Sequence, residues 1–235
     1  MTSAPEYHLI YWRGIPGRGE FVRLAFEATG TAYIDTPGGN DEVVAALSES
    51  DYRPVPFAPP VLKSGDMVLG QTANILLFLG PRLGLVPDTE KGRLQVNQLA
   101  LTALDLSDEA NNVHHPIGVS LYYEDQKPEA ARAAKLFREE RMPKFFEYFE
   151  KVLTGNEWLV GDQLSYADLV LWQVVDGLKF AFPKASNRVL RPLASLQRHY
   201  ERVKNIPNVK RYLESDRRQQ YSMWIFRHYP ELDDN

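Results

Sequence analysis

Gln71 and Thr72 stand at the start of a predicted short helix, the segment QTANILLFLG. A helix N-terminus presents unpaired backbone NH groups and the positive end of the helix dipole, so it attracts a carboxylate. The Thr72 hydroxyl adds a further donor. These residues therefore predict a site for the carboxylate of a small ligand, and an ordinary helix cap is the alternative interpretation of the threonine.

The histidines and the missing cysteines restrict the remaining chemistry. The chain has no cysteine, which excludes disulfides, thiolate metal ligands and a cysteine nucleophile, so any sulfur chemistry must use a thiol that a substrate brings. Among five histidines, His114 and His115 are adjacent. Adjacent side chains on a helix point about 100° apart and cannot share a metal ion as an i, i+4 pair can. We expect no metal site.

Bulk properties are those of an ordinary globular protein of one large or two smaller domains: 235 residues, 44% hydrophobic and 25% charged. The net charge is -4, and Lys and Arg alternate with Asp and Glu instead of forming a basic stripe, so we expect no nucleic-acid partner. No apolar run approaches the ~20 residues of a membrane span, and the N-terminus lacks a signal-peptide pattern. We expect a soluble cytoplasmic protein without a membrane partner.

In the first third of the chain, predicted strands alternate with predicted helices, and these elements would position the residues named above. Period-two and helical apolar spacing, with glycine and proline punctuation, predict the order β-α-β-α-β-β-α and a small mixed sheet. The predicted elements are a strand at 7–12, a helix at 17–30, a strand at 31–34, a helix capped by Asn40, a hairpin VLKSGDMVL with a turn at SGD, and the helix QTANILLFLG, stopped by Gly80-Pro81.

Long helices without strand patterns follow the segment PRLGLVPDTEKG. We therefore predict domains at 1–82 and 91–235, joined by a linker at 83–90. The predicted helices run from Asp88 or Thr89 to about His115, from Pro128 to Leu153 with a bend at Pro143 and a buried stripe of Phe137, Phe145, Phe149 and Leu153, and over 166–178, 192–204 and 207–214.

The segment SYAD is typical of a helix start. Ser165 at the N-cap and Asp168 three residues later can each satisfy the other's free backbone NH, as in a capping box. Leu164 and Leu169 can form the accompanying hydrophobic staple. Because the helix that follows is apolar nearly all round, we interpret this motif as a folding device at the centre of its domain.

Two prolines precede the predicted hairpin in the segment FAPPVLKSGD, residues 57–66. Proline has no backbone NH, so Pro59 and Pro60 remove two donors from the sheet. Such a pair is tolerated only at an edge, at a bulge or at the first residue of a strand. The prolines must therefore serve something other than sheet pairing.

Four segments in order give the chain a resemblance to a known family: IYWRGIPGRGE, PPVL, GQTANI and GDQLSYADLVLW. Together they resemble the cytosolic glutathione S-transferases over almost the whole chain. The resemblance implies an N-terminal thioredoxin-like domain followed by an all-helical domain, glutathione as co-substrate and no metal. It also implies a homodimer, to which Tyr52 and Phe57 could supply an apolar knob.

The resemblance implies a catalytic role for two residues. Tyr11 matches the tyrosine of the sigma, alpha and pi-like classes whose hydroxyl donates to the glutathione thiolate. The alternative interpretation is an aromatic side chain that only packs in the core beside its strand. Arg18 matches the arginine that supports the thiolate electrostatically, and its alternative is a solvated helix charge. The turn from Tyr11 to Arg18 is one residue longer than in those classes.

The same resemblance implies how glutathione is held. Pro60 matches the family's cis-proline, but the preceding residue, Pro59, can offer only its carbonyl to the cysteinyl unit. Gln71 and Thr72 match the pair that binds the γ-glutamyl end. The remaining candidates are Asp105 for the amino group, with an ordinary surface aspartate as alternative, and Arg53 for the glycine carboxylate, because the Trp and Lys common in similar proteins are missing between 37 and 58.

The electrophile site of such folds lies between the two domains. By resemblance its candidates here are Trp12, Ile15, His115, Tyr221, Trp224 and Phe226, and the last three would form a lid from the C-terminal tail. A tail packed as ordinary core is the alternative. The leading hypothesis is a detoxifying transferase that joins glutathione to electrophilic small molecules. The alternatives are a non-catalytic protein that binds ligands or partners on this scaffold, and a glutathione-dependent isomerase or peroxidase.

Overall fold

A four-stranded sheet forms the N-terminal part of the protein, which is described here from a computed structural model covering residues 6–48 and 52–233. The strands are β1 (Tyr7–Ile10), β2 (Tyr33–Asp35), β3 (Val61–Ser64) and β4 (Met67–Gly70), in the order β2-β1-β3-β4. β2 is parallel to β1, and the other two pairs are antiparallel. The predicted mixed sheet is confirmed.

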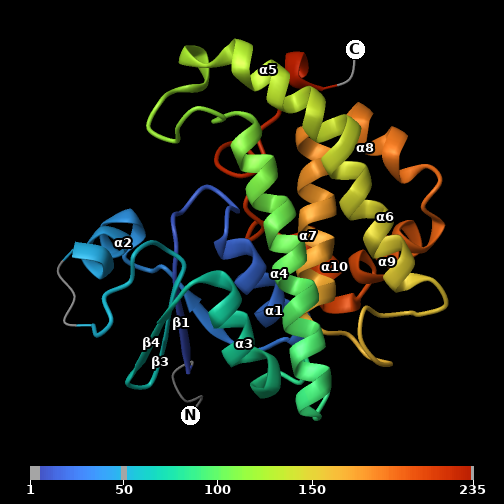
Figure 1. The fold of residues 1–235 in the computed structure, drawn as a ribbon. Coiled ribbons are helices and arrows are strands. Elements are labelled where there is room, and N and C mark those ends of the chain that lie inside the picture. Colours follow the sequence, from blue (N-terminus) through green and yellow to red (C-terminus); the bar gives the residue numbers. More distant parts are fainter. Residues whose placement is uncertain (1–5, 49–51, 234–235) are drawn as a thin grey trace.

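Helices cover both faces of this sheet (Figure 1). Side chains alternate along a strand, so Tyr7 and Leu9 pack with α1 (Gly19–Thr29) and α3 (Thr72–Arg82), while Ile10 packs with α2 (Gly39–Ser48). The apolar stripe of α1 is split between two neighbours. Phe26 joins the sheet cluster, whereas Phe21 packs into the helical part of the protein, so α1 connects the two.

Two boundaries in this part differ from the sequence prediction. β2 begins at Tyr33 because Gly30 closes α1 in the left-handed region and the Thr31 NH still bonds back to the Phe26 carbonyl (3.0 Å). The helix α3 does not stop at Gly80-Pro81 but continues to Arg82. Gly80 serves packing: a Cβ there would lie 2.9 Å from the ring of Tyr166.

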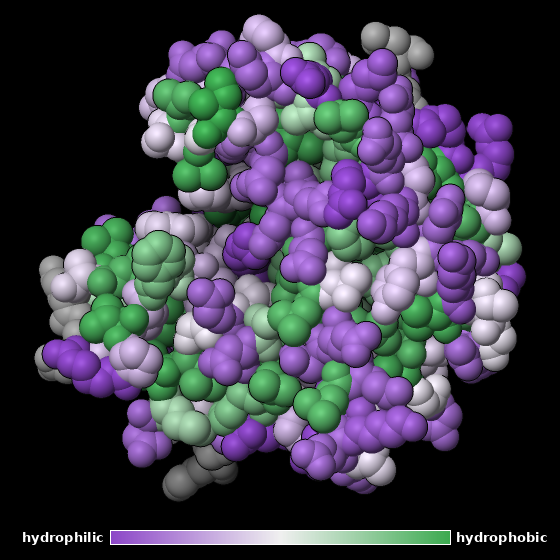
Figure 2. All heavy atoms as spheres, in the orientation of Figure 1, coloured by the Kyte–Doolittle hydropathy of each residue, from purple (hydrophilic) through white to green (hydrophobic). Residues whose placement is uncertain are grey.

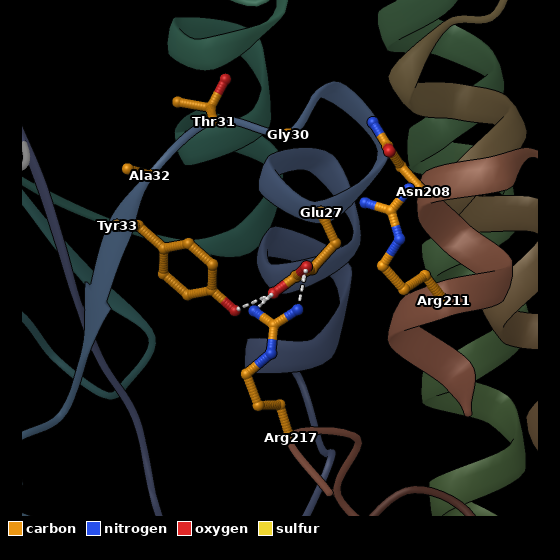
Figure 3. A pocket seen from close by; sticks show the side chains of 8 residues that line it. All are labelled: Glu27, Gly30, Thr31, Ala32, Tyr33, Asn208, Arg211 and Arg217. Carbon is orange, nitrogen blue, oxygen red and sulfur yellow. Dashed lines mark hydrogen bonds and ion pairs between the residues drawn. The ribbon is translucent and has the colours of Figure 1, made fainter. Parts of the chain in front are cut away.

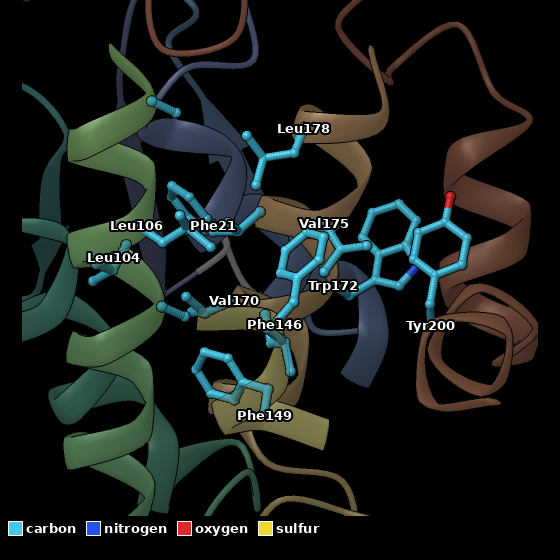
Figure 4. Packing of buried hydrophobic residues seen from close by; sticks show 14 of the residues in the cluster. Phe21, Leu104, Leu106, Phe146, Phe149, Val170, Trp172, Val175, Leu178 and Tyr200 are labelled. Carbon is cyan, nitrogen blue, oxygen red and sulfur yellow. The ribbon is translucent and has the colours of Figure 1, made fainter. Parts of the chain in front are cut away.

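The rest of the chain is helical, as predicted, and α7 lies at its centre (Figure 1). The helices are α4 (Glu90–Val113), α5 (Lys127–Leu136), α6 (Met142–Leu153), α7 (Tyr166–Ala181), α8 (Pro183–Leu190), α9 (Ala194–Lys204) and α10 (Pro207–Leu213), with short 3-10 turns at Tyr123–Asp125 and Pro230–Leu232. Phe146, Val170 and Trp172 are among the side chains that fill the space between α4, α6, α7 and α9 (Figure 4).

The long helix predicted from Pro128 to Leu153 is interrupted. A π-helical turn at Phe137–Arg141 separates α5 from α6, just before Pro143, whose ring and missing NH disturb the regular ladder. Within α6, Phe146 and not Phe145 is fully buried with Phe149 and Leu153, while Phe145 is partly buried against this core. The helix α8 was not predicted.

Two predicted helix starts are confirmed. The Thr89 side chain caps α4 by accepting from the Gly92 NH (3.1 Å). At the start of α7, Asp168 accepts from the Ser165 NH (2.8 Å) and hydroxyl (2.6 Å). Within the described residues, no helix is both long and apolar enough to span a membrane.

Candidate functional site

The register of the sheet aligns three predicted site residues at one end of it. Ile10 pairs with Val61, and Val61 pairs with Gly70. One further step in the same antiparallel registers sets Tyr11 beside Pro60, and Pro60 beside Gln71. The sheet therefore brings the backbone of Tyr11, the proline pair and the start of α3 to the same end.

Tyr11 is fixed by its backbone and its ring. Its NH donates to the Thr36 hydroxyl (2.8 Å), and this hydroxyl donates to the Tyr11 carbonyl (2.9 Å). Gly17 and Gly19 lie directly over the ring, which is 4% exposed: a Cβ at Gly17 would stand 2.1 Å from the phenol oxygen. The turn before α1 thus closely covers the tyrosine side chain.

The Tyr11 hydroxyl lies at the beginning of α1, where it accepts a hydrogen bond from the Arg18 NH (2.8 Å). Burial raises the pKa of this phenol above its ordinary value, although the backbone of Arg18 and the charges of Arg23 and Arg18 act in the opposite direction. The phenol therefore stays protonated at neutral pH. No residue in the described parts of the chain accepts its proton, so the group remains able to donate.

The side chain of Arg18 points away to α4, where it forms an ion pair with Asp108. Both side chains are substantially exposed. This contact joins the turn that carries the site to the helical part of the protein. Asp105 lies one turn earlier on α4 and is exposed; burial and the charges of Asp108 and Glu109 raise its pKa.

The start of α3 offers an unused donor. Gln71 adopts a left-handed conformation (φ 69°), which is uncommon for a residue other than glycine. Thr72 follows it and is buried, yet its hydroxyl has no hydrogen-bond partner among residues 6–48 and 52–233. A buried unpaired hydroxyl at a helix N-terminus fits a ligand carboxylate.

The proline segment contains two cis peptide bonds, Arg53-Pro54 and Pro59-Pro60. Pro60 therefore has the conformation expected of it. Arg53 is exposed, and its guanidinium donates to the Tyr52 carbonyl (2.7 Å). Within the described chain, no hydrogen bond or ion pair links Arg53 or Asp105 to the other predicted site residues.

A hollow lies above the turn between β1 and α1. Figure 2 shows it between the surface over α2 and the segment that follows α4. Trp12 is half-buried against the apolar residues between the sheet and α2, and Ile15 is buried in the turn itself. The Gly14 NH donates to the Gln219 side chain (3.0 Å), so the C-terminal segment reaches this turn.

The other predicted pocket residues divide into two groups. The ring of half-buried His115 contacts the Gln126 amide (3.3 Å), and the neighbouring His114 faces the Ile225 carbonyl (3.4 Å), which brings the tail to the end of α4. Trp224 is 47% exposed. Phe226, in contrast, is buried in the core, and Tyr221 is partly buried against it.

The core packing of those two tail residues involves α7. Phe226 lies against Gly177, where a Cβ would stand 2.2 Å from its ring. The Tyr221 ring stacks on Phe180, and its hydroxyl donates to Asp176 (2.8 Å). These contacts correspond to the alternative of a packed tail.

Three residues near the site were missed in the sequence. Thr36 clamps the backbone of Tyr11, and Glu20 and Arg218 form a buried ion pair between α1 and the C-terminal segment. A glutamate in the first turn of a helix is ordinarily explained by its favourable interaction with the helix dipole. Nothing local in the sequence connects it with an arginine 198 residues later.

Comparisons with known proteins agree with this architecture. Residues 111–216 match the family model of the glutathione S-transferase C-terminal domain. The chain is 30% identical over 216 residues to glutathione S-transferase A4 of Bos taurus, which covers 91% of this chain and 90% of the relative. A glutathione S-transferase of Plasmodium falciparum is 25% identical over 224 residues, with coverages of 91% and 98%.

Solved structures share the fold. A pi-class glutathione S-transferase of Onchocerca volvulus superposes with a TM-score of 0.71 at 23% identity, covering 89% of this chain and 92% of its own. Prostaglandin synthase D of Nilaparvata lugens gives 0.72 at 18% identity, with coverages of 90% and 98%. The chain thus has the fold of this superfamily, a thioredoxin-like part followed by a helical part, and it belongs to the glutathione S-transferase family.

Proposed function

We propose that the protein transfers the thiolate of glutathione to an electrophilic carbon of a small molecule, with Tyr11 as the catalytic residue. One observation carries this proposal: the Tyr11 hydroxyl accepts from the Arg18 NH and keeps its own proton free to donate. A free thiol has a pKa of about 8.5, and a depression of about two units corresponds to ~2.7 kcal/mol. A charge-assisted hydrogen bond supplies ~1.5–3 kcal/mol, so one phenol suffices.

The rest of the tripeptide would lie along the end of the sheet. The γ-glutamyl carboxylate fits the N-terminus of α3, where the unpaired Thr72 hydroxyl and the backbone after Gln71 can donate to it. The Pro59 carbonyl can accept from the cysteinyl NH. We keep Asp105 as the candidate for the amino group and Arg53 as the candidate for the glycine carboxylate.

The reaction needs no further group from the protein. The thiol of bound glutathione releases its proton to solvent. The resulting thiolate attacks the electrophilic carbon and forms the C–S bond, and a leaving group such as chloride departs with its bonding electrons. The hollow over the β1–α1 turn, with Trp12, Ile15, His115 and Trp224 around it, is where we place the electrophile, while Tyr221 and Phe226 support the tail from the core. Detoxification and a cytoplasmic location stay predictions.

We also propose a homodimer. Phe57 is 94% exposed and Val55 is 49% exposed, and both lie in the segment before β3. An apolar ring exposed to this extent is typical of a residue that a partner subunit covers. Tyr52 lies in the same segment and is half-buried, with the Lys63 ammonium 5.1 Å from its ring centre.

A second candidate is a binding protein with the same site but without useful catalysis. Two features support this second candidate. Gly17 closely covers the phenol oxygen that a thiolate must reach, and Pro59 lacks the NH that would bind the cysteinyl unit of glutathione. An isomerase or peroxidase would use the same bound thiolate and differ only in its second substrate.

Turnover of Tyr11→Phe with a chlorinated nitrobenzene separates these candidates. The transferase proposal predicts a loss of about tenfold or more while the variant is still retained on immobilised glutathione. Unchanged turnover would move the role to another residue. A wild-type protein that is retained on glutathione but turns over no electrophile would favour the binding protein.

A further inference from the structure

A buried network of charged residues links the C-terminal segment to the turn that covers Tyr11. Glu20, in the first turn of α1, is fully buried and forms an ion pair with Arg218. Its carboxylate also accepts from the Tyr212 hydroxyl (2.7 Å) and lies 3.4 Å from the Arg23 guanidinium. Two parts of the chain that are distant in sequence, α1 and the segment that holds Tyr212 and Arg218, thus meet at one carboxylate.

Arg23 carries this network to both sides of the tyrosine. Its guanidinium donates to the Pro16 carbonyl (3.3 Å), in the turn that covers the phenol. It also donates to Asp35 (2.8 Å), which directly precedes Thr36, the clamp of the Tyr11 backbone. Its central carbon lies 5.7 Å from the centre of the Tyr11 ring.

Arg218 is held on its other side by α7. Its guanidinium donates to the Gln173 side chain (3.1 Å) and to the Tyr221 hydroxyl (3.0 Å), and it lies 3.4 Å from Asp176. The side chain is only 7% exposed. The arginine therefore links the rigid central helix of the protein to the first turn of α1.

We propose that Arg218 and Glu20 are positioning residues for Tyr11, so that docking of the C-terminal segment sets the geometry of the thiolate site. This inference rests on the proposed function. A buried network of ion pairs and hydrogen bonds holds its members in one arrangement, whereas loss of one charge leaves its partner buried with fewer counter-charges. Without Arg218, Glu20 would retain Arg23 and Tyr212 as its partners among the described residues, and we expect Arg23 to be drawn away from Pro16 and Asp35.

The neighbouring residue provides a matched control. Arg217 also links the C-terminal segment to α1, through two hydrogen bonds to Glu27 (2.5 and 2.9 Å). That pair borders a surface cavity of about 270 Å³ and shares Glu27 with the Tyr33 hydroxyl (Figure 3). The guanidinium of Arg217 is 60% exposed, and the pair lies at the opposite end of α1 from the catalytic turn.

The test compares Arg218→Met with Arg217→Met in the full chain. Titration of the thiolate absorbance of bound glutathione, with kcat and KM for glutathione, reports on the site rather than on stability. A misplacement of 1 Å can cost ~100-fold, so for Arg218→Met we expect kcat to fall about tenfold and the thiolate pKa to rise. KM for glutathione should change little, and Arg217→Met should leave all three values unchanged. Arg218→Lys keeps the charge but not the planar guanidinium with its several donors, so it should lose less activity than Arg218→Met does.

A milder variant covers the case in which Arg218→Met fails to fold. Tyr212→Phe keeps the ring and removes only the hydrogen bond to Glu20, and we expect a smaller shift in the same direction. If bound glutathione is not ionised even in the wild-type protein, the proposed function fails. If it is ionised and both Arg218→Met and Tyr212→Phe leave kcat and the thiolate pKa unchanged, the positioning role is overturned.

Discussion

The α-carbon of Gly17 lies so close to the phenol of Tyr11 that a Cβ on it would stand 2.1 Å from the hydroxyl oxygen. Gly17 also has a left-handed backbone, with φ at 45°. The glycine is therefore required twice, for its backbone conformation and for its missing side chain. The turn is therefore packed directly against the Tyr11 side chain.

Gly17→Ala should lower turnover by more than its loss of stability can explain. The left-handed conformation costs ~1–2 kcal/mol for an alanine, and the clash must also displace the tyrosine ring. Gly14→Ala is the matched control, because Gly14 has φ at 82° and open space around its Cβ position. Thermal unfolding and turnover of both variants check this. Equal losses of turnover in the two variants would contradict a specific contact between Gly17 and Tyr11.

Thr72→Val should weaken glutathione binding without destabilising the protein. The hydroxyl is buried and unpaired, so its replacement by a methyl group removes a cost of ~1–3 kcal/mol in the ligand-free protein. A hydrogen bond to a carboxylate is worth ~1.5–3 kcal/mol, which corresponds to a rise in Kd of roughly tenfold to a hundredfold. Calorimetric titration and thermal unfolding measure both effects.

Thr72→Ser is the control for this change, because it keeps the hydroxyl. It should bind glutathione about as well as the wild-type protein does. If valine lowers stability and leaves the affinity unchanged, Thr72 is an ordinary helix cap and the carboxylate site lies elsewhere.

Asp168→Asn should cause a large loss of stability with little effect on the activity of the folded protein. Asp168 is fully buried and accepts from the Leu159 NH (2.9 Å) and from both groups of Ser165, and it contacts His199 (2.8 Å). Each hydrogen bond to a buried carboxylate is worth ~1.5–3 kcal/mol, and an amide cannot accept all of these bonds, whereas loss of the cap hydroxyl in Ser165→Ala should cost ~1 kcal/mol. Denaturant unfolding measures both values. Similar losses would mean that the cap alone carries the effect.

Stability should fall on mild acidification because of His114. Burial, its largest cause, and the charge of Arg227 lower the pKa of this histidine from 6.5 to about 4. Between these values the unfolded chain binds a proton that the folded chain does not, so stability is full above pH 6.5 and decreases toward pH 4, by up to ~3 kcal/mol. His114→Gln should flatten this part of the curve of unfolding free energy against pH. An unchanged slope would assign it to other groups.

Local signals predicted much of the fold. The order of strands and helices along the first third of the chain follows from alternating periodicity and the Gly65-Asp66 turn, and the starts of α4 and α7 follow from Thr89 and from the Ser165–Asp168 box. These features depend on residues within a few positions of each other. Gly80 was misinterpreted as a stop signal because its reason, the ring of Tyr166, lies on another helix.

The site was less accessible to sequence reasoning. The roles of Tyr11 and Pro60 were predicted from the family resemblance, and that of Thr72 also from its place at a helix N-terminus; these roles stay predictions. The clamp by Thr36 and the pair of Glu20 with Arg218 depend on the tertiary fold, since burial and not residue type gives them their importance. The same holds for Tyr221 and Phe226, whose aromatic character suits a lid and a core equally.

Ionisation of glutathione in its complex tests the central claim most directly. Spectroscopic titration of the thiolate should give a pKa near 6.5 for the wild-type complex, about two units below the free thiol, and Tyr11→Phe should return it toward ~8.5 with affinity largely retained. A wild-type complex that titrates like free glutathione, or a Tyr11→Phe complex that titrates like the wild-type one, would contradict the account.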